Sequence, residues 1–258
     1  MAVSTCESLN SPKMTIALSK LVSFNVKLCE IADRKIFRSS KKKGYVSQLS
    51  SVINEVIDNC KPCSVLEVGG IDKPLLQRSK NIKYDGLDIE HKQQCERIYD
   101  NFFVQSIEEP IRNSYDLIIS KAVLEHVRDN DAGVKQMYQA LRTGGYAIHY
   151  LPSKYHPYSL ALRLSGPKLQ RRLIKILRPW AEDETGYPAF FNNCSPEEMR
   201  KLFKSHGFGS VKIIPFFRAN DYFRFFLPFY IAVTLWENIC AKLKWETFCS
   251  GFIVIAGK

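Results

Sequence analysis

The stretch Val65-Leu-Glu-Val-Gly-Gly70 decides the fold class, because it reads as a buried strand that ends in an acid and then in glycines. Glycine at such a position lets a ligand touch the backbone, and a helix that follows would offer free N–H groups. About twenty residues downstream, where nucleotide-binding folds place a carboxylate against a ribose diol, Tyr84-Asp-Gly-Leu-Asp88 is a second strand that ends in an acid. The two stretches predict parallel strands with a ligand at their carboxyl ends.

Short apolar runs separated by turn and helix signals continue after Pro62, which is typical of strands that alternate with helices around a parallel sheet. We therefore expect a doubly wound α/β fold with a seven-stranded, mostly parallel sheet, an antiparallel last strand and helical insertions. The expected strands are residues 63–68, 83–87, 102–105, 116–120, 146–151, 211–217 and 248–256.

Helix signals fill most of the connections between these strands. A helix over residues 72–79 can follow the first strand, and one over 131–142 can precede the fifth, whereas only a short helix or loop fits at 90–97. Ser195-Pro-Glu-Glu198 predicts a helix start, with serine as N-cap, that runs to about His206.

The chain of 258 residues reads as one large domain with additions. Residues 1–61 are expected to be a helical segment that packs on the core, with two helices either side of the basic stretch 38–43. Residues 62–258 would form the main domain, with an acceptor-side insertion at 152–194 and an apolar insertion at 219–246.

Composition bounds the setting and the partners. Eight scattered cysteines and the lack of a secretory leader favour a cytoplasmic protein, either free or peripherally bound at the inner face of the membrane. Cys60 and Cys63 read as two ordinary thiols, because no second Cys-x-x-Cys completes a zinc site, and no metal is expected. The formal net charge of +11 predicts attraction to polyanions, including anionic lipid, and basic residues gather between Lys154 and Arg178.

Three more motifs follow in order: Tyr115-Asp-Leu-Ile-Ile-Ser120, Val123-Leu-Glu-His-Val127 and Leu141-Arg-Thr-Gly-Gly-Tyr146. With them, residues 65–151 resemble the class I S-adenosylmethionine-dependent methyltransferases, of the type 11-like group. The proline-aromatic insertion after the fifth strand and the aromatic segment before the seventh loosely resemble methyltransferases of bacterial cell-surface glycan synthesis.

The resemblance implies S-adenosylmethionine as cofactor and assigns residues to it. Glu67 and Gly69 would line its methionine part, Asp88 would bind the ribose hydroxyls, and Gln105 with Ser106 would meet the adenine. Ser120 and Lys121 would border the transfer site, and Gly70 and Ile89 complete the cofactor-binding set. The chain departs from the family where Gly-x-Gly reads Gly69-Gly-Ile71, and where Gln105-Ser106 replaces the acid after the third strand.

Methyl transfer depends mainly on positioning, and a general base is needed only if the acceptor must lose a proton. For a hydroxyl acceptor His126 and His156 are the candidates, whereas His149 lies inside a strand and is expected to be packed. The segment that begins at Pro152 should cover the acceptor site, because ligands gather at the carboxyl ends of the strands.

The predicted function is methyl transfer, to an oxygen of a small-molecule, sugar or lipid-linked glycan acceptor. A nucleic-acid methyltransferase is an alternative that the sequence does not favour, since it lacks the Asn/Asp-Pro-Pro-Tyr/Phe tetrad that holds a flipped base. A non-catalytic domain that binds S-adenosylmethionine is the other alternative.

The segment 222–236 is unusually apolar for a connection late in the chain. Pro228, Glu237, Asn238 and Lys242 in or next to it argue against a transmembrane helix. It predicts a helix that packs on the domain, lies in a membrane interface or covers an apolar acceptor, and an anionic membrane surface is a candidate partner.

Overall fold

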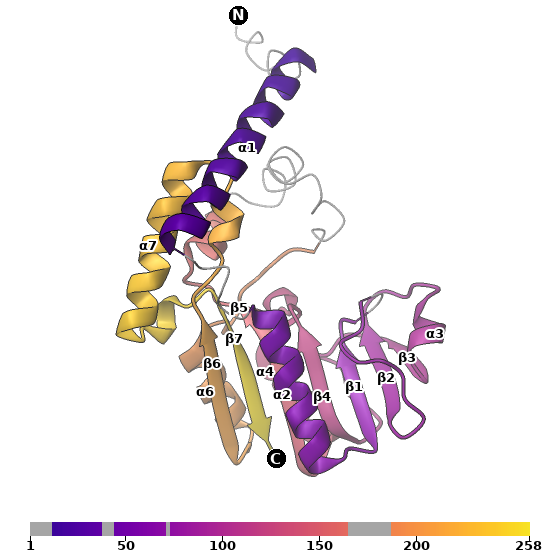
Figure 1. Cartoon of the computed structure of the whole chain (residues 1–258). Coiled ribbons are helices and arrows are strands. Elements are labelled where there is room, and N and C mark those ends of the chain that lie inside the picture. Colours follow the sequence, from indigo (N-terminus) through magenta and orange to yellow (C-terminus); the bar gives the residue numbers. More distant parts are fainter. Residues whose placement is uncertain (1–11, 38–43, 71–72, 165–186) are drawn as a thin grey trace, which may run out of the picture.

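The computed structural model describes residues 12–37, 44–70, 73–164 and 187–258. Seven strands form one sheet in the order β3-β2-β1-β4-β5-β7-β6 (Figure 1). Strands β1 to β5 run parallel, and β7 is antiparallel to both of its neighbours, which confirms the predicted fold class. The strands are β1 (Ser64–Val68), β2 (Lys83–Asp88), β3 (Asn101–Val104), β4 (Tyr115–Lys121), β5 (Leu141–Pro152), β6 (Ser210–Phe216) and β7 (Gly251–Gly257).

The central strands are buried on both faces, as expected for a parallel sheet between two layers of helices. Val65 and Leu66 of β1 are both fully buried but belong to different clusters of the core, because successive side chains point to opposite faces. One face is covered by α2 (Tyr45–Cys60), whose Leu49 and Ile53 join the cluster of Val65. The other is covered by α4 (Asn130–Ala140) and α6 (Pro196–Ser205).

The helix predictions are confirmed in part. Helix α6 starts after Ser195 and ends before His206, as its capping residues predict. Helix α4 ends at Ala140, two residues early, because Leu141 already pairs with Tyr115 in the sheet. Between β2 and β3 only the short helix α3 (Cys95–Ile98) forms.

The helix expected over 72–79 is wrong for the part the structure describes, since residues 73–79 are irregular. Lys73 precedes Pro74, and a residue before proline disfavours the helical region. The next backbone donors bond to side chains of the sheet: Leu75 N–H donates to the Glu67 carboxylate at 3.1 Å and Leu76 N–H to the Tyr84 hydroxyl at 3.3 Å. Hydrogen bonds to side chains of β1 and β2 thus take the place of the main-chain bonds of a helical turn.

The last strand begins later than predicted. Glu246–Phe248 form a 3₁₀ turn, and β7 starts only at Gly251, where it pairs with Phe216 of β6. The Ser250 N–H donates to the Phe216 carbonyl, so the chain enters the sheet at this residue instead of at Phe248.

Helix α1 (Pro12–Ala32), continued by a π-helical turn at Asp33–Phe37, packs on α7 (Leu227–Leu243). Asn25 accepts a hydrogen bond from Leu227 N–H at 3.0 Å, and the Tyr230 hydroxyl donates to Asp33 at 3.3 Å. The two helices lie side by side, beyond the end of the sheet at which β5 ends (Figure 1). None of the helices in the described ranges is long and apolar enough to cross a membrane.

Candidate functional site

The carboxyl ends of β2, β1 and β4 lie along one edge of the sheet. Val68 pairs with Leu87 on one side and with Ser120 on the other. Gly69 N–H donates to the Leu87 carbonyl at 2.8 Å, and Gln105 N–H donates to the Asp88 carbonyl at 3.0 Å. The main chain therefore brings together the residues that follow each strand, which the sequence predicts to bind the cofactor.

Gly69 needs to be glycine in this structure. Its φ of +79° lies in the left-handed region, and a Cβ added there would collide with Val123 after β4. This close approach joins the turns after β1 and β4 and shapes the edge between them.

Glu67 is buried and its carboxylate is occupied by neighbouring groups. It accepts hydrogen bonds from Leu75 N–H, from the Tyr84 hydroxyl and, at 3.3 Å, from the Tyr99 hydroxyl. Burial raises the pKa of Glu67 to about 7, against the lowering effect of the Leu75 N–H and the Tyr99 hydroxyl. A Cβ at Gly70 would collide with the Glu67 carboxyl and the Tyr99 hydroxyl, so these residues form one packed unit beneath the edge.

Asp88 is more open. Its carboxylate accepts a hydrogen bond from Glu90 N–H at 2.9 Å within its own turn, and burial raises its pKa. A carboxylate offers about four acceptor positions, so the turn uses only part of this capacity. The next residue, Ile89, is 59% exposed, which places an open apolar side chain beside an acceptor group.

Gln105 and Ser106 follow β3 beside this turn. The Gln105 side-chain amide donates to the Pro110 carbonyl at 3.4 Å, and Ser106 exchanges hydrogen bonds with Glu108 through its hydroxyl. These contacts hold the loop after β3 in place next to Asp88.

Ser120 and Lys121 end β4, and their side chains have different environments. The Ser120 hydroxyl lies 2.7 Å from Nδ1 of His149, and both residues are fully buried. Burial lowers the pKa of His149 to about 3, so this ring is neutral, and the prediction that His149 is packed is confirmed. The chain leaves the sheet after Lys121 through Ala122, whose φ of +56° is unusual for a residue with a Cβ and stores backbone strain.

His126 belongs to a 3₁₀ turn, Leu124–His126, that precedes α4. Its Nδ1 lies 3.1 Å from the Pro188 carbonyl, which can only accept, so Nδ1 carries the hydrogen and Nε2 carries the lone pair. Burial lowers the pKa of His126 and favours this neutral form. The side chain remains 34% exposed, and its ring lies 6.2 Å from that of Tyr187.

Glu125, beside His126, is a residue that the sequence did not single out. It is buried, its Oε2 has no hydrogen-bond partner in the described structure, and burial raises its pKa to about 8. Its Oε1 lies 3.8 Å from His126 Nε2, and its carbonyl accepts from the N–H groups of Phe190 and Phe191. The motif around it was visible in the sequence, but nothing there indicated that its carboxyl group is buried.

His156 occupies a different environment. It is fully buried, its Nε2 lies 3.2 Å from the Glu237 carboxylate, and its Nδ1 accepts from Tyr158 N–H at 3.2 Å. Glu237 also accepts from Ala219 N–H. His156 thus ties the segment after β5 to α7, and both of its ring nitrogens are engaged in this structure.

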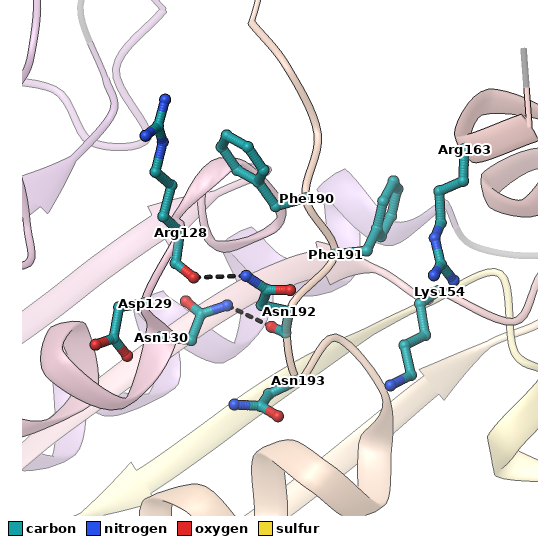
Figure 2. A pocket seen from close by; sticks show the side chains of 9 residues that line it. All are labelled: Arg128, Asp129, Asn130, Lys154, Arg163, Phe190, Phe191, Asn192 and Asn193. Atoms are coloured by element: carbon teal, nitrogen blue, oxygen red, sulfur yellow. Dashed lines mark hydrogen bonds between the residues drawn. The ribbon is translucent and has the colours of Figure 1, made fainter. Parts of the chain in front are cut away.

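An open cavity of about 380 Å³ lies next to the turn of His126, between the segments that follow β4 and β5 (Figure 2). Arg128 stands over the Phe190 ring at 5.3 Å, and Lys154 pairs with Glu198. Its lining is mostly polar and includes the cationic side chains of Arg128, Lys154 and Arg163. The other lining residues are Asp129, Asn130, Phe190, Phe191, Asn192 and Asn193. The basic residues from Lys168 to Arg178 fall outside the described residues.

The backbone around this cavity is strained and held by amide side chains. Phe191 and Asn193 both adopt left-handed φ values, +55° and +56°. The Asn192 amide donates to the Arg128 carbonyl at 2.5 Å, and the Asn130 amide donates to the Asn192 carbonyl at 2.6 Å (Figure 2). Among the residues described, no group of three or more histidine, cysteine or acidic side chains could hold a metal ion.

The strand order and this functional edge define the class I methyltransferase fold, with a sheet of seven strands whose last is antiparallel. The sequence pattern of the Methyltransferase domain family matches residues 33–213, and the chain belongs to that family. It is therefore a methyltransferase that depends on S-adenosylmethionine, as its motifs predict. No curated protein matched the sequence.

Two solved structures illustrate the shared fold. A SAM-dependent methyltransferase from Archaeoglobus fulgidus is similar with a TM-score of 0.50 and 16% identity, over 86% of this chain and 98% of the other. Phosphoethanolamine N-methyltransferase 2 of Haemonchus contortus, solved with S-adenosyl-L-methionine, gives 0.50 and 12% identity over 98% of this chain and 58% of the other.

We predict that His156→Ala destabilises the protein by about 3 kcal/mol, because it leaves the buried Glu237 carboxylate without its main side-chain partner. Urea unfolding followed by circular dichroism measures the change. His206→Ala is the control: it removes a 2.9 Å contact to the exposed Asp131 and should cost below about 1 kcal/mol. Equal effects of the two changes would contradict a structural role for His156.

Proposed function

We propose that this methyltransferase transfers a methyl group to an oxygen of a small-molecule, sugar or lipid-linked glycan acceptor. The observation that carries the proposal is His126, whose Nε2 carries the lone pair in the turn after β4, two residues before Arg128 of the polar cavity. Nucleic acid is not the favoured acceptor, and an anionic membrane surface is a proposed partner where the acceptor is lipid-linked.

The cofactor side of the site follows from the edge of the sheet. Asp88 has free acceptor positions for the two ribose hydroxyls, and the exposed Ile89 offers apolar surface to a flat base. Gln105 and Ser106 would meet the adenine, and the turn at Gly69 would let the methionine part approach the main chain. When bound, S-adenosylmethionine supplies a methyl group on a positively charged sulfur.

Glu67, with Gly70 packed against its carboxyl group, contributes in a different way under this proposal. Since the Glu67 carboxylate is already bonded to Leu75, Tyr84 and Tyr99, we assign it to positioning: it fixes the turn at Gly69. Ser120 likewise contributes its main chain, because its hydroxyl is committed to His149. Lys121 remains at the border of the transfer site.

The acceptor would lie in the cavity that the described ends of the segment 152–194 help to line, next along the chain from the turn of His126. Arg128, Lys154 and Arg163 suit an acceptor that carries hydroxyl or anionic groups, because cationic and amide donors satisfy such oxygens. His126 Nε2 would take the proton of the attacking hydroxyl while the oxygen bonds to the methyl carbon and the bond from that carbon to sulfur breaks, its electron pair going to sulfur. The charge on the oxygen is then never fully developed. His156 is not proposed as the base, since it is fully buried.

We predict that Asp88→Ala weakens the binding of S-adenosylhomocysteine by about 1–3 kcal/mol, because the ribose hydroxyls lose their acceptor. Isothermal titration calorimetry measures the affinity. Asp131→Ala removes an exposed carboxylate of α4 that pairs with His206, and serves as the matched control. Unchanged affinity in Asp88→Ala would remove Asp88 from the cofactor site.

We predict that His126→Ala lowers the rate of methyl transfer about 10²- to 10⁴-fold, since it removes the base. The base acts in its neutral form, and its pKa lies below the usual 6.5, so the wild-type rate should be flat at neutral pH and fall only as the pH drops through that lowered pKa. Transfer of labelled methyl from S-adenosylmethionine into extracts of small molecules and of lipid-linked glycans measures the rate.

In the variant the acid limb of this profile should disappear together with the rate. His206→Ala controls for the loss of a partly exposed imidazole. A His126→Ala enzyme with the full rate at every pH would show that positioning alone suffices.

A further inference from the structure

Exposed apolar side chains concentrate on two helices of this protein. Of the seventeen large hydrophobic residues that are exposed in the described structure, ten belong to the segments 19–37 and 226–245. They are Leu21, Phe24, Ile31, Ile36, Phe226, Phe229, Leu235, Ile239, Leu243 and Trp245. We call them the two-helix apolar face. Such a concentration marks an interaction surface, whereas single exposed apolar residues do not.

On α1 the exposed apolar residues form a stripe. Leu21, Phe24 and Ile31 lie at positions i, i+3 and i+10, which fall on one side of a helix. Other residues of α1 bond to the rest of the protein: Asn25 accepts from Leu227 N–H of α7, and the Cys29 thiol donates to the Arg224 carbonyl before α7. The helix therefore has one side used by the fold and another apolar side left open.

Helix α7 repeats this arrangement. Leu235, Ile239 and Leu243 recur every four residues and are each about half exposed, at 49%, 49% and 50%. Tyr230, Val233 and Cys240 are buried against the protein. A helix that is apolar on both its packed and its exposed sides needs a second apolar environment for the latter.

Basic side chains border the two-helix apolar face. Lys20 and Lys27, seven residues apart, are exposed next to the α1 stripe, and Lys242 and Lys244 are exposed at the end of α7. Glu30 is the exposed acid within 19–37, whereas Asp33 is buried and accepts from Tyr230. Two copies of this surface would bring like charges together, which opposes self-association and favours an anionic partner.

The position of the face also matters. Strands β5 and β6 are both antiparallel to β7, so α7, which joins β6 to β7, lies at the edge where the parallel strands end. Figure 1 shows α1 and α7 standing beyond that edge. The two helices are therefore at the same end of the sheet as the turn that carries His126.

We propose that the two-helix apolar face docks this methyltransferase on the surface of an anionic lipid bilayer. Aromatic and aliphatic side chains would enter the boundary between headgroups and acyl chains, and the bordering lysines would meet the negative headgroups. The docking does not depend on which acceptor is methylated, although it would bring a lipid-linked acceptor to the cavity.

Co-sedimentation with vesicles tests the proposal, using phosphatidylcholine alone and phosphatidylcholine mixed with phosphatidylglycerol. The protein should sediment with the mixed vesicles, and added salt should weaken binding as the Debye length shortens. Phe24→Gln with Ile239→Gln removes two large side chains without changing the charge and should weaken binding about ten- to hundredfold. Val46→Gln, on α2 and 47% exposed in the native protein, is the matched control and should bind as the native protein does.

A second variant, Lys20→Gln with Lys27→Gln, should weaken binding to the mixed vesicles and reduce its dependence on salt. Calorimetry with S-adenosylhomocysteine confirms that each variant is folded, and it separates a failure of docking from a failure of the proposed function. Absence of binding to both vesicle types would overturn the proposal. So would a dimer in analytical ultracentrifugation that Phe24→Gln with Ile239→Gln dissociates, because a second copy would then cover the face.

Discussion

The parallel register of β1 with β2 and β4 is the constraint on which the rest of this structure depends. Because Val68 is level with Leu87 and Ser120, the residues after these positions leave the sheet at the same height. Two main-chain hydrogen bonds, from Gly69 N–H and Gln105 N–H, extend the pairing one step beyond the strands. The edge that we propose as the cofactor site is thus set by backbone geometry, and this geometry accommodates the altered glycine pattern of the chain.

Two buried carboxyl groups, those of Glu67 and Glu125, follow or precede the turns at this edge, and their environments give them different roles. Glu67 is surrounded by hydrogen-bond donors and holds the turn after β1. Glu125 has an oxygen without a partner, a pKa raised to about 8, and His126 Nε2 within 3.8 Å. Because the buried acid is uncharged at neutral pH, no negative charge beside His126 stabilises the protonated imidazole. Burial therefore lowers the pKa of His126.

The sequence predicted the sheet well because local patterns determine its strands, and the order of parallel strands follows from their alternation with helices. It failed where distant contacts decide. The helix expected after β1 is replaced by bonds from Leu75 and Leu76 to side chains of β1 and β2. The burial of His156 requires Glu237, which lies 81 residues away along the chain. The pairing of α1 with α7 has no local signal either, whereas the apolar composition of 222–236 did indicate a helix with an interaction surface.

We propose that the edge formed by β2, β1 and β4 holds the cofactor with its reactive end toward His126. A crystal structure of the protein with S-adenosylhomocysteine tests it most directly. In this structure we expect a ribose bonded to the Asp88 carboxylate, an adenine beside Ile89, and a sulfur atom that faces the cavity of Arg128 and Lys154. A ligand bound elsewhere, with Asp88 and Ile89 still open to solvent, would contradict it.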